Sequence, residues 1–104
     1  MITVGEIGKT INLNTGTDLS AATDFEVVFT KPDGTTITKG TADGVAIGVA
    51  PYTAECSIYA ANEYISYAVE AGVIDADGDW YVRAVTYFGT NKYIGKNALM
   101  KVYA

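Results

Sequence analysis

Turn-forming residues divide this chain into segments of strand length, and this spacing constrains the fold more than any other feature. Glycine, asparagine, aspartate and proline gather at short sites: Asn14–Gly16, Lys31–Gly34, Asp43–Gly44, Asp77–Gly78 and Gly89–Asn91. Most of the intervals hold one or two strand-length segments, which is typical of a β-sandwich rather than a helical bundle. Because 104 residues can bury one core, we expect a single all-β domain over residues 1–104.

The clearest element is a hairpin around the turn Lys31–Gly34. The segment Phe25–Thr30 alternates apolar and polar side chains, and Thr35–Lys39 carries a single large apolar residue at its centre. Pro32 sets the φ angle of the turn, and Gly34 supplies its positive-φ position. The sequence therefore predicts two antiparallel strands joined by a tight turn.

The longest strand signal is Asp79–Phe88. One face is expected to point into the core, with Trp80, Val82, Ala84 and Phe88; the opposite face carries Tyr81, Arg83, Val85 and Tyr87. A turn after Phe88 leads into Tyr93–Ile94 and Asn97–Tyr103, which we expect to pair back as the last hairpin. Ile2–Val4 and Lys9–Leu13 supply two short strands near the N-terminus.

The stretch Thr53–Gly72 fits two structures. Read as strands, it alternates on both sides of a break at Ala61–Asn62; read as a helix, its apolar residues follow the i, i+4, i+7 pattern. Its tyrosine and isoleucine content favours strands. A single helical turn around Ala71–Ile74 is a further expectation.

Composition excludes several classes of function. The chain has no histidine, so it offers no imidazole base and no histidine-bearing zinc site. It carries 12 acidic and 7 basic side chains, and the basic ones are scattered, which argues against a nucleic-acid partner. No segment approaches the roughly 20 apolar residues that span a bilayer, and Met1–Gly5 lacks the pattern of a signal peptide. We expect a soluble protein, made in the cytoplasm, with no membrane or cofactor.

Two features that could carry chemistry have simpler structural explanations. Asp75, Asp77 and Asp79 alternate around a glycine as calcium ligands do, but the position of the bidentate glutamate in such a loop is Thr86. We therefore expect a solvated acidic turn and no metal site. Cys56 is the only cysteine, and its apolar surroundings predict a buried small side chain rather than a reactive thiol.

The chain is unusually rich in tyrosine, with eight tyrosines among 104 residues. Tyrosine is a frequent anchor of protein interfaces, and aromatic rings also stack on sugars. Tyr81, Arg83 and Tyr87 lie on the strand face opposite Trp80, so they cannot all be core residues. With Tyr103, they form the candidate interface; simple exposure, or cover by a loop, is the alternative.

The segments Asp24–Thr35 and Gly72–Arg83 resemble the immunoglobulin-like domain at the head of tailed-phage baseplate upper proteins. In that family an apolar strand ends in a Lys-Pro-Asp-Gly-like turn, and a later glycine followed by an aromatic residue opens a long central strand. The resemblance extends from about Lys9 to Tyr103. It implies an immunoglobulin-like antiparallel β-sandwich that serves in docking, with no catalytic residue.

The resemblance implies a non-enzymatic structural protein of a tailed bacteriophage, located in the virion. It would act as an adaptor, docking or capsid-decoration subunit. Its expected partners are capsid, connector or baseplate proteins, or further copies of itself. The alternative from the aromatic content is a carbohydrate-binding or host-adhesion β-sandwich module. A third class, a small enzyme, would need the carboxylates of Asp75, Asp77 and Asp79 to face a cleft, which the strand pattern disfavours.

Overall fold

The computed structural model describes residues 2–54 and 57–104, and nearly all of its regular structure is strand. The strands are β1 (Ile2–Thr3), β2 (Thr10–Asn14), β3 (Asp24–Thr30), β4 (Thr36–Lys39), β5 (Ala46–Ile47), β6 (Tyr52–Ala54), β7 (Ser57–Tyr59), β8 (Tyr64–Ala68), β9 (Gly78–Phe88), β10 (Asn91–Ile94) and β11 (Ala98–Tyr103). One 3₁₀ turn, η1 (Thr41–Asp43), precedes β5. In this described part, no helix is long and apolar enough to cross a membrane.

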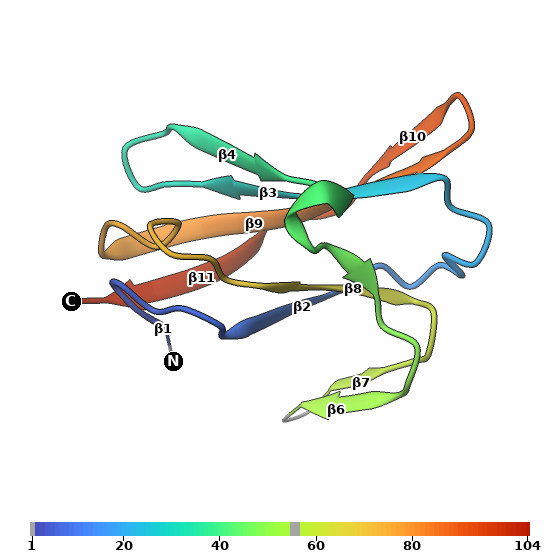
Figure 1. Ribbon diagram of the computed structural model, residues 1–104, viewed down its shortest axis with the longest axis horizontal. Helices are drawn as coiled ribbons and strands as arrows, with labels where there is room; N and C mark the ends of the chain where they lie inside the picture. The colour runs from blue at the N-terminus through green and yellow to red at the C-terminus, as the bar shows by residue number, and fades with distance from the viewer. Residues whose placement is uncertain (1, 55–56) are drawn as a thin grey trace.

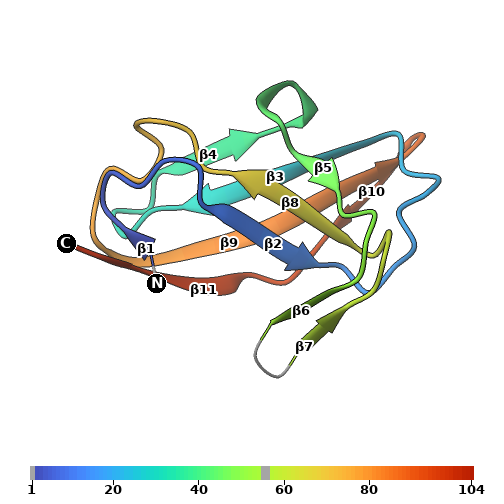
Figure 2. The same cartoon turned by 60° about the horizontal axis from the view of Figure 1, so that its bottom comes forward.

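Two sheets pack face to face (Figures 1 and 2). The large sheet has the order β1-β11-β9-β3-β4, with β10 also on β9, and the small sheet has the order β2-β8-β5. These orders match the G-F-C-C′ and B-E-D strands of an immunoglobulin domain. All strand pairs are antiparallel except β1 with β11. The predicted all-β sandwich is confirmed, with one parallel pair that the sequence prediction did not include.

The core lies between the sheets and is built on β9. Trp80 and Val82 are almost fully buried, and the ring of Phe29 on β3 meets Trp80 edge-on, with centroids 6.3 Å apart. From the small sheet, Tyr67 approaches Phe29 at 5.8 Å between centroids. Aromatic pairs of this geometry stabilise a core beyond the area that they bury. The predicted core face of the long strand is therefore confirmed.

The structure also confirms the predicted hairpins. Strands β3 and β4 pair in register around Lys31–Gly34, and Gly34 has φ +91° as the turn requires. The last hairpin exists, but its second strand is divided: β10 pairs with one end of β9 and β11 with the other. Gly95 bridges the division, because its N–H donates to the carbonyl oxygen of Ala84 at 2.8 Å.

The ambiguous stretch consists of strands. β6 and β7 form a small hairpin that projects from the sandwich (Figure 2), and β8 is the centre of the small sheet. Asn62, at the predicted break, has φ +64°, a left-handed conformation that asparagine tolerates. Residues 71–74 form a hydrogen-bonded turn rather than a helical one. The prediction for Cys56 lies outside the described residues.

The two N-terminal strands belong to different sheets. β1 joins the large sheet beside β11, whereas β2 pairs with β8 in the small sheet. The side of β2 away from β8 is an edge of the sandwich.

Candidate functional site

The outer face of the large sheet carries three large, solvent-exposed side chains on its neighbouring strands β9 and β11. Tyr81 on β9 lies directly opposite Leu99 on β11, and Tyr103 follows on β11 with its side chain on the same face. Their exposed fractions are 44%, 53% and 49%, respectively. We call these three residues the Tyr81 patch. The sequence prediction contained Tyr81 and Tyr103 but not Leu99, whose place opposite Tyr81 depends on the strand register.

Arg83 occupies the next outward position on β9 and has a different environment. It lies opposite Val28 of β3, and both Val28 and the outward-facing Val85 are buried, with exposed fractions of 8% and 3%. Long side chains on this face must therefore cover the two valines. Arg83 is half-buried, and its Nε has no hydrogen-bond partner among the described residues. Its apolar stem serves the sheet as cover.

Tyr87 lies at the opposite end of β9. It lies six positions after Tyr81, which is about 20 Å along an extended strand. Its hydroxyl donates to Glu26 Oε1 at 2.8 Å, and Lys92 Nζ lies 5.8 Å from its ring centroid. The hydrogen bond to Glu26 raises the pKa of Tyr87. The structure thus places Tyr81 and Tyr103 on the outward face of two neighbouring strands and leaves Tyr87 in a separate polar cluster.

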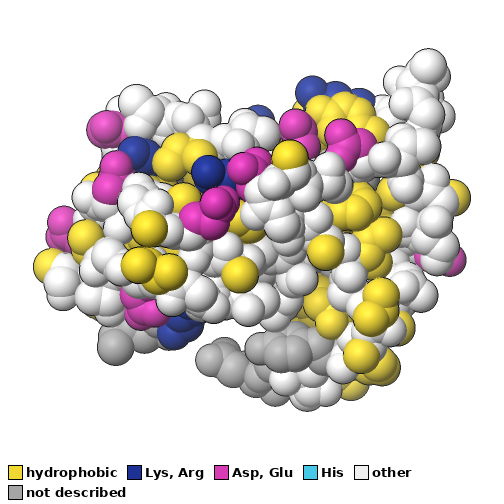
Figure 3. Space-filling model, viewed as in Figure 1, with side chains coloured by type: hydrophobic (Ala, Val, Ile, Leu, Met, Phe, Trp, Pro, Cys, Tyr) yellow, Lys and Arg dark blue, Asp and Glu magenta, His cyan; other side chains and the backbone are white. Residues whose placement is uncertain are grey.

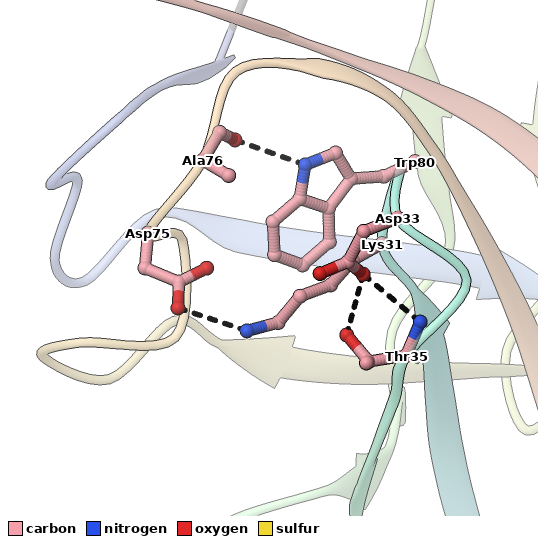
Figure 4. A network of polar contacts seen from close by, with 6 residues as sticks. All are labelled: Lys31, Asp33, Thr35, Asp75, Ala76 and Trp80. Atoms are coloured by element: carbon pink, nitrogen blue, oxygen red, sulfur yellow. Dashed lines mark hydrogen bonds and ion pairs between the residues drawn. The ribbon is translucent and has the colours of Figure 1, made fainter.

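The acidic turn has a structural role, as Figure 4 shows. Asp75 Oδ2 forms an ion pair with Lys31 Nζ at 2.8 Å, and the same Nζ lies 5.9 Å from the ring centroid of Trp80. The indole N–H of Trp80 donates to the carbonyl oxygen of Ala76 at 3.0 Å. These contacts fasten the 74–78 loop to the β3–β4 turn. Within the described residues, no three His, Cys, Asp or Glu side chains are placed to hold a metal ion.

A groove that the sequence analysis did not predict lies between the edges of the two sheets. Its volume is about 810 Å³, and it runs between β2 on one side and β10 with the start of β11 on the other. Ala84, Thr86 and Phe88, from the inner face of β9, form part of its lining, and Tyr59 and Tyr93 contribute rings. A smaller recess of about 290 Å³ continues it along β2.

Apolar side chains gather on the surface near this groove. In Figure 3 they cover the side of the molecule between the β10 hairpin and the β6–β7 hairpin. Tyr93 and Ile94 are 57% and 59% exposed. The signal in the sequence was the short apolar pair Tyr93–Ile94 next to Gly95, but only the path of β10 brings this pair beside β2.

Comparison of the chain with family models, with curated proteins and with solved structures gives no match.

Proposed function

We propose that this protein is a non-enzymatic docking subunit of a tailed-phage particle, and that the Tyr81 patch contacts another virion protein of the capsid, connector or baseplate. The observation that carries the docking role is the patch itself. Three large side chains, each about half exposed, point outward from β9 and β11 on the outer face of the large sheet. Aromatic residues at the centre of an apolar patch are typical interface anchors.

The neighbourhood of the patch suits docking. Its residues lie on two neighbouring strands of the large sheet, β9 and β11, which pair antiparallel. Lys101 lies on the same face between Leu99 and Tyr103, directly opposite Asp79. Charged side chains beside apolar and aromatic anchors are found in the rim of protein interfaces.

The placement in a phage particle rests on the resemblance of Asp24–Thr35 and Gly72–Arg83 to the baseplate family. Of the three carboxylates that the enzyme hypothesis needs, Asp75, Asp77 and Asp79, the first pairs with Lys31. This contact supports a role of Asp75 in architecture rather than catalysis.

Immunolabelling tests the location. Particles of the phage that carries the gene are imaged by negative stain with an antibody against this chain, and we expect labelled virions. Particles that remain unlabelled, although the antibody recognises the free protein, would refute the virion role.

Substitutions test the surface. The double variant Tyr81→Ser, Leu99→Ser should reduce incorporation into particles at least tenfold, because interface anchors cost about 2 kcal/mol or more when truncated. Val49→Ser is the matched control, since Val49 is 79% exposed and lies outside the patch. Circular dichroism verifies that both variants fold. Normal incorporation of the double variant would remove the patch from the interface, and saccharide binding on a glycan array that the double variant abolishes would favour the adhesion alternative.

A further inference from the structure

The backbone of β2 has one paired side and one open side. Beyond its two ends, the N–H of Val69 donates to the carbonyl oxygen of Lys9 at 2.9 Å, and the N–H of Thr15 donates to that of Glu63 at 2.8 Å. In a strand, successive residues direct their N–H and C=O groups to opposite sides. The odd-numbered residues of this stretch therefore face β8.

The even-numbered residues, Thr10, Asn12 and Asn14, direct their backbone groups away from β8. Among the described strands, β8 is the only partner of β2. Three consecutive outward sites thus present donors and acceptors along the open side. Such an edge is a template for another strand.

This open edge borders the groove along its whole length. The large groove is lined by Asn12 and Asn14, and the smaller recess by Thr10 and Ile11. Both are closed on the other side by the β10–β11 segment of the large sheet. A chain added to β2 would therefore lie between two walls and above an apolar floor.

The edge carries none of the usual protection against strand addition. β2 reads Thr-Ile-Asn-Leu-Asn, with no charge, proline or glycine. Native edge strands are commonly guarded by charges, prolines or bulges. The other edge of the sandwich differs, because β4 ends in Lys39.

The charges of the groove indicate what it would accept. The chain has a net charge of −5, yet the charged side chains that line the groove and recess are Lys96 and Lys9. They lie at opposite ends, since Lys96 lines the part beside Asn14 and Lys9 the part beside Thr10. Lys96 therefore favours a segment with an acidic residue at the end beside Asn14.

We propose that the groove binds one extended segment of a partner protein, which adds to the small sheet as a new strand beside β2. The segment has apolar side chains at alternate positions, directed into the groove, and an acidic residue near Lys96. A second copy of the sandwich fits less well, because the edge of its sheet would collide with the β10–β11 segment that bounds the groove. The proposal rests on the docking function, and the groove shares only Leu99 with the Tyr81 patch, because Leu99 also lines the smaller recess.

The test attaches a probe strand to the full chain. A peptide of about seven residues spans β2 with a residue to spare at each end; it has valine at alternate positions, threonine between them and aspartate at both ends. A glycine-serine linker of about 20 residues, joined after Ala104, spans roughly 25 Å. The tether holds the peptide at about millimolar effective concentration, so even a weak strand occupies the groove. A fusion of scrambled sequence, with the valines consecutive, is the control.

Hydrogen exchange measured by NMR reports the result. We expect the amides of Thr10, Asn12 and Asn14 to exchange at least about tenfold more slowly in the fused chain than in the scrambled control. Asn12→Pro should abolish this protection, because it removes an outward donor and leaves the β2–β8 bonds intact. Thr38→Pro on the edge strand β4 is the matched control. The Lys31 N–H donates to the carbonyl oxygen of Thr35, and hydrogen-bonded pairs alternate along the β3–β4 ladder. The backbone N–H of Thr38 therefore points away from β3, and proline there removes no β3–β4 hydrogen bond.

Two results would overturn the proposal. Equal exchange in the fused and scrambled chains means that the groove does not accept a strand. Incorporation of a Tyr81→Ser, Tyr103→Ser variant decides the docking function separately, because neither residue lines the groove or the recess. If cellohexaose or maltohexaose protects these amides and the fused strand does not, the groove is a sugar site.

Discussion

Gly48 lies directly under the ring of Tyr64, and replacing it by alanine should damage the small sheet. A methyl group built at Gly48 would overlap the Tyr64 ring. The Tyr64 hydroxyl donates to the carbonyl oxygen of Ala50 at 2.7 Å, and its ring meets that of Tyr59 edge-on at 5.6 Å between centroids. Tyr64 thus joins β8 to the segment that leads into the β6–β7 hairpin.

The size of the stability loss follows from the interactions that the displaced Tyr64 ring gives up. Losing the hydroxyl hydrogen bond costs about 1 kcal/mol, and partial exposure of the aromatic side chain costs roughly 2 kcal/mol. Replacing glycine by alanine restricts the unfolded chain and returns about 0.7 kcal/mol. Gly48→Ala should therefore lower the free energy of unfolding by about 2 kcal/mol, or Tm by roughly 10 °C in a domain of this size.

Urea denaturation followed by fluorescence measures this loss. Gly40→Ala is the control, because a methyl group there meets no atom within 4 Å and its φ of −114° suits alanine. In a Tyr64→Ala background, Gly48→Ala should stabilise the domain by about 0.7 kcal/mol, which gives a coupling energy of about 3 kcal/mol. Equal losses with and without the Tyr64 ring would refute the steric explanation.

Three further predictions concern side-chain contacts. Trp80→Phe should cost about 2–3 kcal/mol in urea denaturation, because it removes a buried indole and its hydrogen bond; a loss below 1 kcal/mol would contradict this packing. Asp75→Asn should cost less than about 1 kcal/mol, and less still in high salt, since its ion pair with Lys31 is partly exposed. Burial, with the hydrogen bond to Glu70, raises the pKa of Tyr67 from 10.0 to about 12. The folded chain holds this proton longer than the unfolded chain, so stability should be unaffected below pH 10 and fall between pH 10 and about 12. Tyr67→Phe should flatten that fall in denaturation curves measured across this range.

The sequence predicted what local patterns determine. The Pro32–Gly34 turn and the alternation from Asp79 to Ala84 each depend on residues close in the chain, and both are found in the structure. The alternation of burial ends there, because Val85 and Thr86 are buried as well. Strands were also favoured correctly in Thr53–Gly72, because aromatic and β-branched side chains suit a half-buried pleated surface.

Long-range pairing was not predictable in the same way. The separation of Tyr87 from Tyr81 follows from simple strand length, but its bond to Glu26 depends on the β3–β9 register. The groove depends on β10 lying beside β2, two segments about 80 residues apart in the chain. No local pattern in either segment reports this proximity.

The pairing of the first strand with the last has a consequence for synthesis. β1 finds its partner only when β11 has been made, and β9, the centre of the large sheet, is itself late in the chain. Until residue 88 leaves the ribosome, β3 lacks its partner strand β9, and Phe29 lacks the Trp80 ring against which it packs. Long-range contacts of this kind delay folding, so the nascent chain must keep its core residues soluble through most of its translation.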